Sequence, residues 1–271
     1  MSAPSDATRF ANVETANDPA ALVAFLDART GIEGERQVKE LEFAMLRIGP
    51  GLQILDVGCG TGDDAREIAA LLGPKGKVTG IDVSPTMIAE ACKRSLPNSL
   101  PVEFTEGSAL DLPFAGESFD RVRTDRVLVH LPEPAQALAE MVRVVRSDGR
   151  VVVSELDLGT QFLDSRNPLT TLKVLSSFAD RTASGRIGRA LPRLLGETGM
   201  SDIECAPRVI RTNLKFFERI VGGHLGNPDI AKEFGAGELD AWWQDLAAAD
   251  AAGCFNYGVT VLTVSGRKGG E

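Results

Sequence analysis

The stretch that decides the fold is Ile54-Leu55-Asp56-Val57-Gly58-Cys59-Gly60-Thr61-Gly62. The apolar run Gln53–Val57 predicts a buried strand, and the glycines after it predict a turn into a helix that begins near Asp64. Glycine tolerates positive φ and lets a ligand approach the backbone closely. The first turn of a helix also offers unpaired N–H groups. Because ligands of open α/β sheets bind beyond the carboxyl ends of the strands, this turn is a candidate binding loop.

Outward from this turn, short apolar runs alternate with amphipathic stretches. Further strands are predicted at 77–82, 102–106, 119–124, 150–155, 202–208 and 258–266. Helices are predicted at 35–46, 64–72, 85–93, 134–145, 188–198 and 239–251, with another that opens at Asp18 and Pro19. Several strands lack polar alternation, which is typical of strands covered on both faces. The alternation predicts an α/β fold with a doubly wound sheet.

Composition narrows the class of protein. The chain has 271 residues, of which 43% are hydrophobic and 25% are charged. Such a chain can bury a full core, and it is too apolar to be disordered. Lys and Arg total 29 and Asp and Glu total 38, which gives a net charge of −9. An acidic total argues against nucleic acid as a partner and against attachment to an anionic membrane.

Cysteine and histidine usage argues against a metal site. The four cysteines contain no C-x-x-C pair, and the chain has only two histidines. The start has no secretory signal pattern, and no apolar run approaches the roughly 20 residues of a membrane span. We therefore expect a reduced, cytoplasmic enzyme or binding protein with no metal and no membrane span.

The spacing of the loop glycines indicates the charge of the ligand. A dinucleotide fingerprint is G-x-G-x-x-G, whereas here the spacing is G-x-G-x-G and Asp63 stands where the third fingerprint glycine would be. Asp63 and Asp64 suit the N-terminus of a helix but would repel a pyrophosphate, and Asp56 adds another negative group. The loop therefore favours a cofactor with a cationic end.

Other signals follow along the chain. Asp82 closes the second strand, 20 residues after Gly62, where an acidic residue accepts hydrogen bonds from ribose hydroxyls. The segment 107–114 follows the third strand, 119–124 leads to His130, and 143–150 forms a helix end and turn before the fifth strand.

Taken together, these residues resemble the class I S-adenosylmethionine-dependent methyltransferases, in particular the small-molecule branch with the ubiquinone/menaquinone-type enzymes. The resemblance covers about 50–156 closely. It implies a Rossmann-like, doubly wound seven-stranded sheet whose last strand is antiparallel. It also implies an N-terminal helical lid at 1–49, a methyltransferase domain at 50–271, and lid insertions at about 156–186 and 209–257. The expected cofactor is S-adenosylmethionine, with S-adenosylhomocysteine as product.

The resemblance carries roles to particular residues. The cofactor-binding residues that it implies are Asp56, Gly58, Cys59, Gly60, Thr61, Gly62, Asp82, Val83, Met87, Ser108, Ala109, Asp125 and Arg126. The loop would pass under the methionine part, with residues 125–126 beside it. Asp82 would hold the ribose, and the remaining four would surround the adenine. Ser108 stands where the family often has an acidic residue. Lys39, with Arg36 beside it, is a possible partner of the cofactor carboxylate.

His130 is the candidate catalytic residue. It follows the fourth strand, and the pKa of an ordinary histidine suits general-base chemistry; the alternative is a structural histidine bonded to a loop. His224 could reach a substrate from the second insertion. Cys59 is expected to be a small filler, and the aromatic residues near 216–217, 242–243 and 255–257 predict an apolar lid.

The function expected is methyl transfer to a small, apolar or aromatic acceptor by in-line displacement, with a place in secondary metabolism. An obligatory base is not required, because the reaction depends chiefly on orientation. A nicotinamide-dependent oxidoreductase and a non-catalytic cofactor-binding module are the alternatives. Carbon, nitrogen and oxygen acceptors all stay open, as does the oligomeric state.

Overall fold

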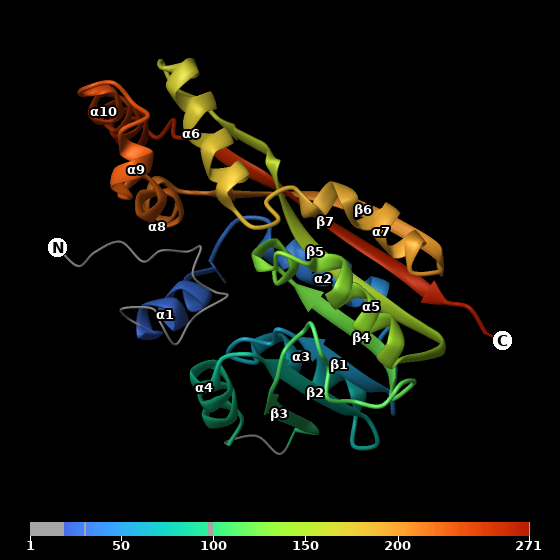
Figure 1. Ribbon diagram of the computed structural model, residues 1–271. Helices are drawn as coiled ribbons and strands as arrows, with labels where there is room; N and C mark the ends of the chain where they lie inside the picture. Colours follow the sequence, from blue (N-terminus) through green and yellow to red (C-terminus); the bar gives the residue numbers. More distant parts are fainter. Residues whose placement is uncertain (1–18, 30, 97–99, 271) are drawn as a thin grey trace.

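A computed structural model describes residues 19–29, 31–96 and 100–270. Its centre is a seven-stranded sheet in the order β3-β2-β1-β4-β5-β7-β6 (Figure 1). The strands are β1 (Gln53–Val57), β2 (Lys77–Asp82), β3 (Val102–Glu106), β4 (Phe119–Asp125), β5 (Val145–Leu163), β6 (Met200–Thr212) and β7 (Tyr257–Lys268). The pairs among β1 to β5 are parallel, and β7 is antiparallel to both β5 and β6. The expected Rossmann-like fold is confirmed.

Helices cover both faces of this sheet. They are α1 (Pro19–Arg29), α2 (Glu35–Leu46), α3 (Asp63–Leu72), α4 (Pro85–Ser95), α5 (Pro134–Val144), α6 (Pro168–Arg181), α7 (Ile187–Glu197), α8 (Leu214–Leu225), α9 (Pro228–Ala231) and α10 (Glu238–Ala251). Asp18, the expected cap of α1, lies outside the described residues. A short 3₁₀ helix, η2 (Leu128–His130), follows β4.

Successive residues of the central strands point to opposite faces and enter different cores. Ile54 packs with Leu46 of α2 and Ile68 of α3 on one face. Leu55 belongs to the core on the other face, under α5 and α7. Burial on both faces explains why these strands are apolar throughout. Within the predicted lid 1–49, α2 therefore also serves as a covering helix of the sheet.

The last strands are longer than the sequence indicated. The strand predicted to end at Glu155 continues to Leu163, and β6 continues to Thr212. Both therefore extend into the two segments interpreted as insertions. Beyond Asp157 the pairing of β5 with β7 shifts register before it resumes at Phe162. The predicted end of the strand at Glu155 was too early because Asp157 is a polar residue, whereas an ion pair with Arg189 lets it be buried within the strand.

A second core lies at the far ends of these long strands. There α6, α8, α9 and α10 gather beyond the cofactor half of the sheet (Figure 1). Trp242 is fully buried, and its Nε1 donates a hydrogen bond to Thr171 Oγ1 at 2.9 Å. Phe217 packs against Tyr257 with ring centroids 4.6 Å apart. This helical cluster is thus held together by aromatic residues that were predicted to form an apolar lid: Trp242, Trp243, Phe217 and Phe255.

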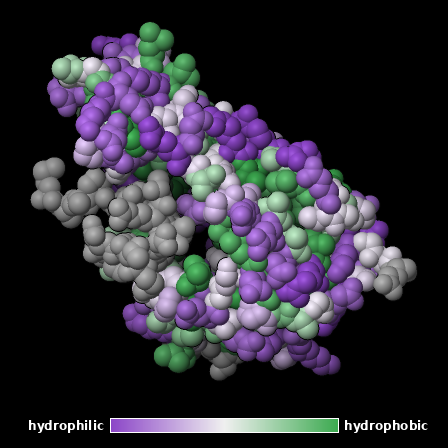
Figure 2. All heavy atoms as spheres, viewed as in Figure 1, coloured by the Kyte–Doolittle hydropathy of each residue, from purple (hydrophilic) through white to green (hydrophobic). Residues whose placement is uncertain are grey.

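The visible surface in Figure 2 is mostly hydrophilic, with small scattered groups of apolar residues. Among residues 19–29, 31–96 and 100–270, no helix is both long enough and apolar enough to cross a membrane.

Two leucine truncations test the helical cluster. Leu246 of α10 is 0% exposed and Leu169 of α6 is 81% exposed. Leu246→Ala should lower the free energy of unfolding by about 2–5 kcal/mol, because it leaves a cavity. Leu169→Ala should change it by less than about 0.5 kcal/mol. Urea unfolding followed by circular dichroism measures both; equal losses would show that the cluster is not packed as described.

Candidate active site

One cavity of about 660 Å³ opens at the carboxyl ends of β1, β2 and β4. Most residues that the sequence assigned to the cofactor line it: Lys39, Gly58, Cys59, Gly60, Thr61, Asp82, Val83, Met87, Ser108, Ala109, Asp125 and Arg126. His130 lines it as well. Asp56, at the end of β1, and Gly62, at the start of α3, do not line it. The strands thus bring together side chains from five separate segments, as the fold requires.

The glycine-rich loop is shaped by its backbone. Gly58 has a φ of 72°, and a Cβ there would lie 2.1 Å from Val127 Cγ2. Gly58 N and Cys59 N both donate to the carbonyl oxygen of Ile81, which ties the loop to β2. Only glycine satisfies both the conformation and the space at position 58.

Asp82 connects the loop to the end of β2. Its Oδ2 accepts a hydrogen bond from Gly60 N and its Oδ1 accepts one from Ser84 N, both at 2.9 Å. Burial raises the pKa of this carboxyl, against the backbone hydrogen bonds that lower it. Each carboxylate oxygen keeps further lone-pair capacity. Beside it Val83 is 53% exposed although apolar, as expected for a side chain that faces a ligand site.

A buried ion network around Arg123 lies under the loop. This guanidinium, on β4, bonds Glu42 of α2, Asp56 Oδ1 at 2.8 Å and Asp64 Oδ2 at 3.1 Å. Burial raises the pKa of Glu42 to about 7 and that of Asp56 to about 6, and Arg123 opposes both shifts. Asp56 and Asp64 flank the glycine-rich loop, so Arg123 fixes both of its ends. Sequence reasoning missed this residue; the one signal was an arginine inside a predicted buried strand.

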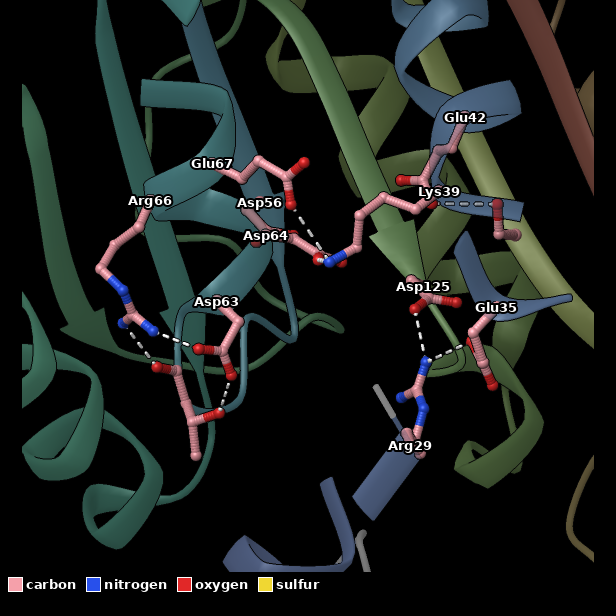
Figure 3. A network of polar contacts seen from close by, with 12 residues as sticks. Arg29, Glu35, Lys39, Glu42, Asp56, Asp63, Asp64, Arg66, Glu67 and Asp125 are labelled. Atoms are coloured by element: carbon pink, nitrogen blue, oxygen red, sulfur yellow. Dashed lines mark hydrogen bonds and ion pairs between the residues drawn. The ribbon is translucent and has the colours of Figure 1, made fainter. Parts of the chain in front are cut away.

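Lys39 is engaged with carboxylates of α3. Its Nζ lies 2.6 Å from Asp64 Oδ1 and 3.3 Å from Glu67 Oε2, as Figure 3 shows. Arg36 pairs with Glu40 on an exposed part of α2. The carboxylates that the sequence placed at the loop are therefore matched by cations of the protein itself.

A second ion cluster lies at the end of β4. Arg126 has a φ of 57°, in the left-handed region, and its guanidinium binds both carboxylate oxygens of Glu35. Arg29 of α1 bonds Asp125 Oδ2 at 2.9 Å. Burial alone would raise the pKa of Asp125, but Arg126, Arg29 and Arg123 hold it well below its usual range. Strained backbone of this kind is typical of functional sites.

His130 is the last residue of η2, and a buried acid bonds the first residue of this short helix. Burial and then the charge of Arg29 lower the pKa of His130 to about 4, so the ring is neutral at pH 7. Glu155, fully buried, accepts a hydrogen bond from Leu128 N at 2.6 Å. Burial raises the pKa of Glu155 to about 8, with Asp125 adding to the shift and backbone hydrogen bonds opposing it.

Two further predictions concern His224 and Cys59. His224 is buried in the helical cluster, within 3.1 Å of Ser177 Oγ, and does not line the cavity. The expectation that it could reach a substrate is therefore wrong, because α8 turns it inward against Phe178. Burial, with Asp56 and Asp82, keeps the pKa of Cys59 well above its usual value, which disfavours the reactive thiolate.

The other half of the cavity is apolar. Its side chains come from α1, the segment between α1 and α2, α2, α6, α8 and the extended strands: Phe25, Ile32, Val38, Leu156, Leu158, Phe178, Ile210, Phe216, Ile220, Tyr257 and Val259. Phe25 and Phe216 lie with ring centroids 4.9 Å apart, so α1 contacts α8 across the cavity. The predicted aromatic lid thus supplies Phe216 and Tyr257 to the cavity.

Comparison with known proteins decides the family. The family model described as "Methyltransferase domain" matches residues 48–188. The chain belongs to this methyltransferase family. This confirms the expected class, an S-adenosylmethionine-dependent methyltransferase, and decides against the nicotinamide-dependent alternative.

Relatives agree with the family, and a solved structure shares the fold. An "Uncharacterized 37.1 kDa protein in transposon TN4556" of Streptomyces fradiae is 37% identical over 256 residues, which cover 89% of this chain and 70% of that protein. "O-methyltransferase resE" of Aspergillus sclerotiorum is 35% identical over 191 residues, 68% of this chain and 69% of that protein. The solved YcgJ protein of Bacillus subtilis has the same fold, with a TM-score of 0.64, 16% identity, and coverage of 88% of this chain and all of that one.

The residues of this methyltransferase fit the cofactor. The Gly58 cradle would be filled by a side chain, Asp82 has acceptor capacity left for hydroxyl groups, and an exposed Val83 lies beside it. The carboxylates that line the cavity outnumber its cations, which suits a ligand of net positive charge. Within the described part of the chain, no cluster of three or more His, Cys, Asp or Glu side chains could hold a metal ion.

A pair of glycine substitutions tests the loop. Gly58 and Gly73 both have positive φ, but nothing lies within 4 Å of a Cβ at Gly73. Gly73→Ala should cost about 1–2 kcal/mol from backbone strain alone. Gly58→Ala should cost more and abolish binding of S-adenosylhomocysteine in calorimetry, whereas Gly73→Ala should leave that binding intact. Normal binding by Gly58→Ala would contradict the tight contact with Val127.

Glu155 predicts a pH dependence of stability. The folded protein keeps the Glu155 proton up to about pH 8, whereas the unfolded chain loses it near the ordinary glutamate pKa of 4.5. Stability from this group is therefore complete below about pH 4.5 and decreases as pH rises to about 8. Glu155→Gln, which mimics the protonated acid, should flatten the decline of Tm between pH 5 and 8 in differential scanning calorimetry. An unchanged slope would show that Glu155 is ionised in the folded state.

Proposed function

We propose that this methyltransferase transfers a methyl group from S-adenosylmethionine to a small, apolar or aromatic acceptor. One observation carries the proposal: a single cavity joins the glycine-rich loop and Asp82 to a wall of aromatic and aliphatic side chains. The first end suits a nucleoside with a charged amino-acid group, and the second suits a molecule with few polar groups. The relative named "O-methyltransferase resE" supports methyl transfer as the activity.

Each end of the cavity has a proposed role. Asp82 accepts hydrogen bonds from the ribose hydroxyls, and Val83, Met87, Ser108 and Ala109 surround the adenine. The loop around Gly60 lies under the methionine part, beside Asp125 and Arg126. The apolar wall orients the acceptor and excludes water, which raises the rate by alignment. Bound S-adenosylmethionine supplies the electrophilic sulfonium methyl.

His130 keeps its proposed role as a base with a limited contribution. Its lowered pKa leaves the ring unprotonated at neutral pH and able to accept a proton from an acceptor hydroxyl. A base this weak provides little driving force. Alignment by the apolar wall therefore contributes most to the rate in this proposal.

We propose the cytoplasm as the compartment and no nucleic acid as a partner. The four cysteines are unpaired, which suits a reducing compartment. The net charge of −9 disfavours a phosphate backbone. Two points stay predictions. One is the role of α1 and of the two insertions as a lid, and the other is a place in secondary metabolism.

Substitution of Asp82 tests the cofactor end. Asp82→Ala should weaken binding of S-adenosylhomocysteine about 100-fold or more, since it removes charged hydrogen bonds to the ribose and releases Gly60 N. Asp111→Ala, which removes an exposed carboxylate after β3 that does not line the cavity, is the control and should bind normally. Isothermal titration calorimetry measures both affinities. No binding by the wild-type protein would reject the function itself.

The acceptor class is tested with labelled cofactor. Transfer of the labelled methyl group to a panel of naphthols, quinols and phenols should exceed transfer to amino acids and sugars. Activity only on the polar compounds would contradict the apolar end of the cavity.

A further inference from the structure

The cations that line the cavity differ in how many of their donors are used. Arg123 bonds through Nε, Nη1 and Nη2 to three different carboxylates. Arg126 uses Nη1 and Nη2 on Glu35, and its Nε makes no hydrogen bond but lies 3.3 Å from Asp125 Oδ1. Lys39 pairs with two carboxylates of α3, and the side chain of Arg36 is 85% exposed. None of these four offers an enclosed guanidinium whose terminal nitrogen is unused.

Arg29 is different. Its Nη2 makes both of its ion pairs, at 2.9 Å to Asp125 and 3.6 Å to Glu35. Its Nε is enclosed without a hydrogen bond, and Nη1 has no partner among the residues that the structure describes. The side chain is 21% exposed and lines the cavity. Figure 3 shows it reaching from α1 toward Asp125 and Glu35, across the open site from Lys39.

Spare donors on an enclosed guanidinium indicate an anionic ligand. Buried N–H groups are nearly always satisfied, and a guanidinium matches a carboxylate better than any other side chain does. The surrounding cluster is balanced, since Arg29 and Arg126 face Asp125 and Glu35. A carboxylate at the unused nitrogen therefore meets a donor that no group within residues 19–29, 31–96 and 100–270 occupies.

We propose that Arg29, and not Lys39, binds the carboxylate at the methionine end of the cofactor. The proposal rests on the proposed function, which puts that end beside Asp125. Arg29 is the last residue of α1, so this contact joins α1 to the glycine-rich loop through the ligand. The same helix supplies Phe25 to the apolar wall, and cofactor binding thereby completes the acceptor end of the cavity.

Two ligands that differ in the amino-acid group test the proposal. S-adenosylhomocysteine carries the carboxylate, and 5′-deoxy-5′-methylthioadenosine has the same nucleoside thioether without it. Arg29→Met should weaken S-adenosylhomocysteine about ten- to a hundred-fold, the range of a charged hydrogen bond. It should change the affinity for methylthioadenosine by less than about two-fold. Calorimetry at one pH and salt concentration gives both values.

Arg94→Met is the matched control. Arg94 joins α4 to α1 through Asp27 at 2.7 Å but does not line the cavity. It should change the affinity for either ligand by less than about three-fold. Equal weakening of both ligands by Arg29→Met would mean that α1 had only loosened, and this would overturn the proposal. Unchanged affinity for S-adenosylhomocysteine would also overturn it, and a loss with Lys39→Met alone would return the role to Lys39.

If wild-type protein binds methylthioadenosine but binds S-adenosylhomocysteine no more tightly, the carboxylate has no site and the proposal is rejected. If wild-type protein binds neither ligand, the proposed function fails first. The two failures are thus distinguishable.

Discussion

The ion network of Arg123 is the constraint on which the site depends. A guanidinium in the middle of a central strand is expensive to bury unless every nitrogen is bonded. Here the partners come from α2, β1 and α3. Glu42 also accepts a hydrogen bond from Ser154 of β5, whose hydroxyl contacts Thr263 of β7. One buried cation therefore connects the glycine-rich loop to strands on the far side of the sheet.

This network also explains the acidic character of the loop. Asp56 and Asp64 indicated from sequence a cofactor with a cationic end, yet both are paired first with Arg123 or Lys39. The two carboxylates beside the loop are thus paired within the protein. The excess of carboxylates over cations belongs to the cavity as a whole. The inference about ligand charge stands on the sum of the charges and not on those two residues alone.

The cofactor half of the fold could be predicted because its signals are local. The Gly58–Gly62 turn, Asp82 at the end of β2 and the alternation of strand and helix each lie within a short window. The Arg123 network and the Arg29 contact could not, because they join residues as far apart as 29 and 125. Asp157 misled the strand prediction for the same reason, since its partner Arg189 lies on a later helix.

The length of β5, β6 and β7 affects how the acceptor of such a protein can change in evolution. Their outer ends and the helices packed there supply the acceptor wall, through Leu158, Ile210 and Tyr257. The inner ends of β1, β2 and β4 supply the cofactor loop. Mutations that reshape the outer ends can therefore select a new acceptor while the methyl-donor machinery stays intact, and substrate range and chemistry can evolve separately along one sheet.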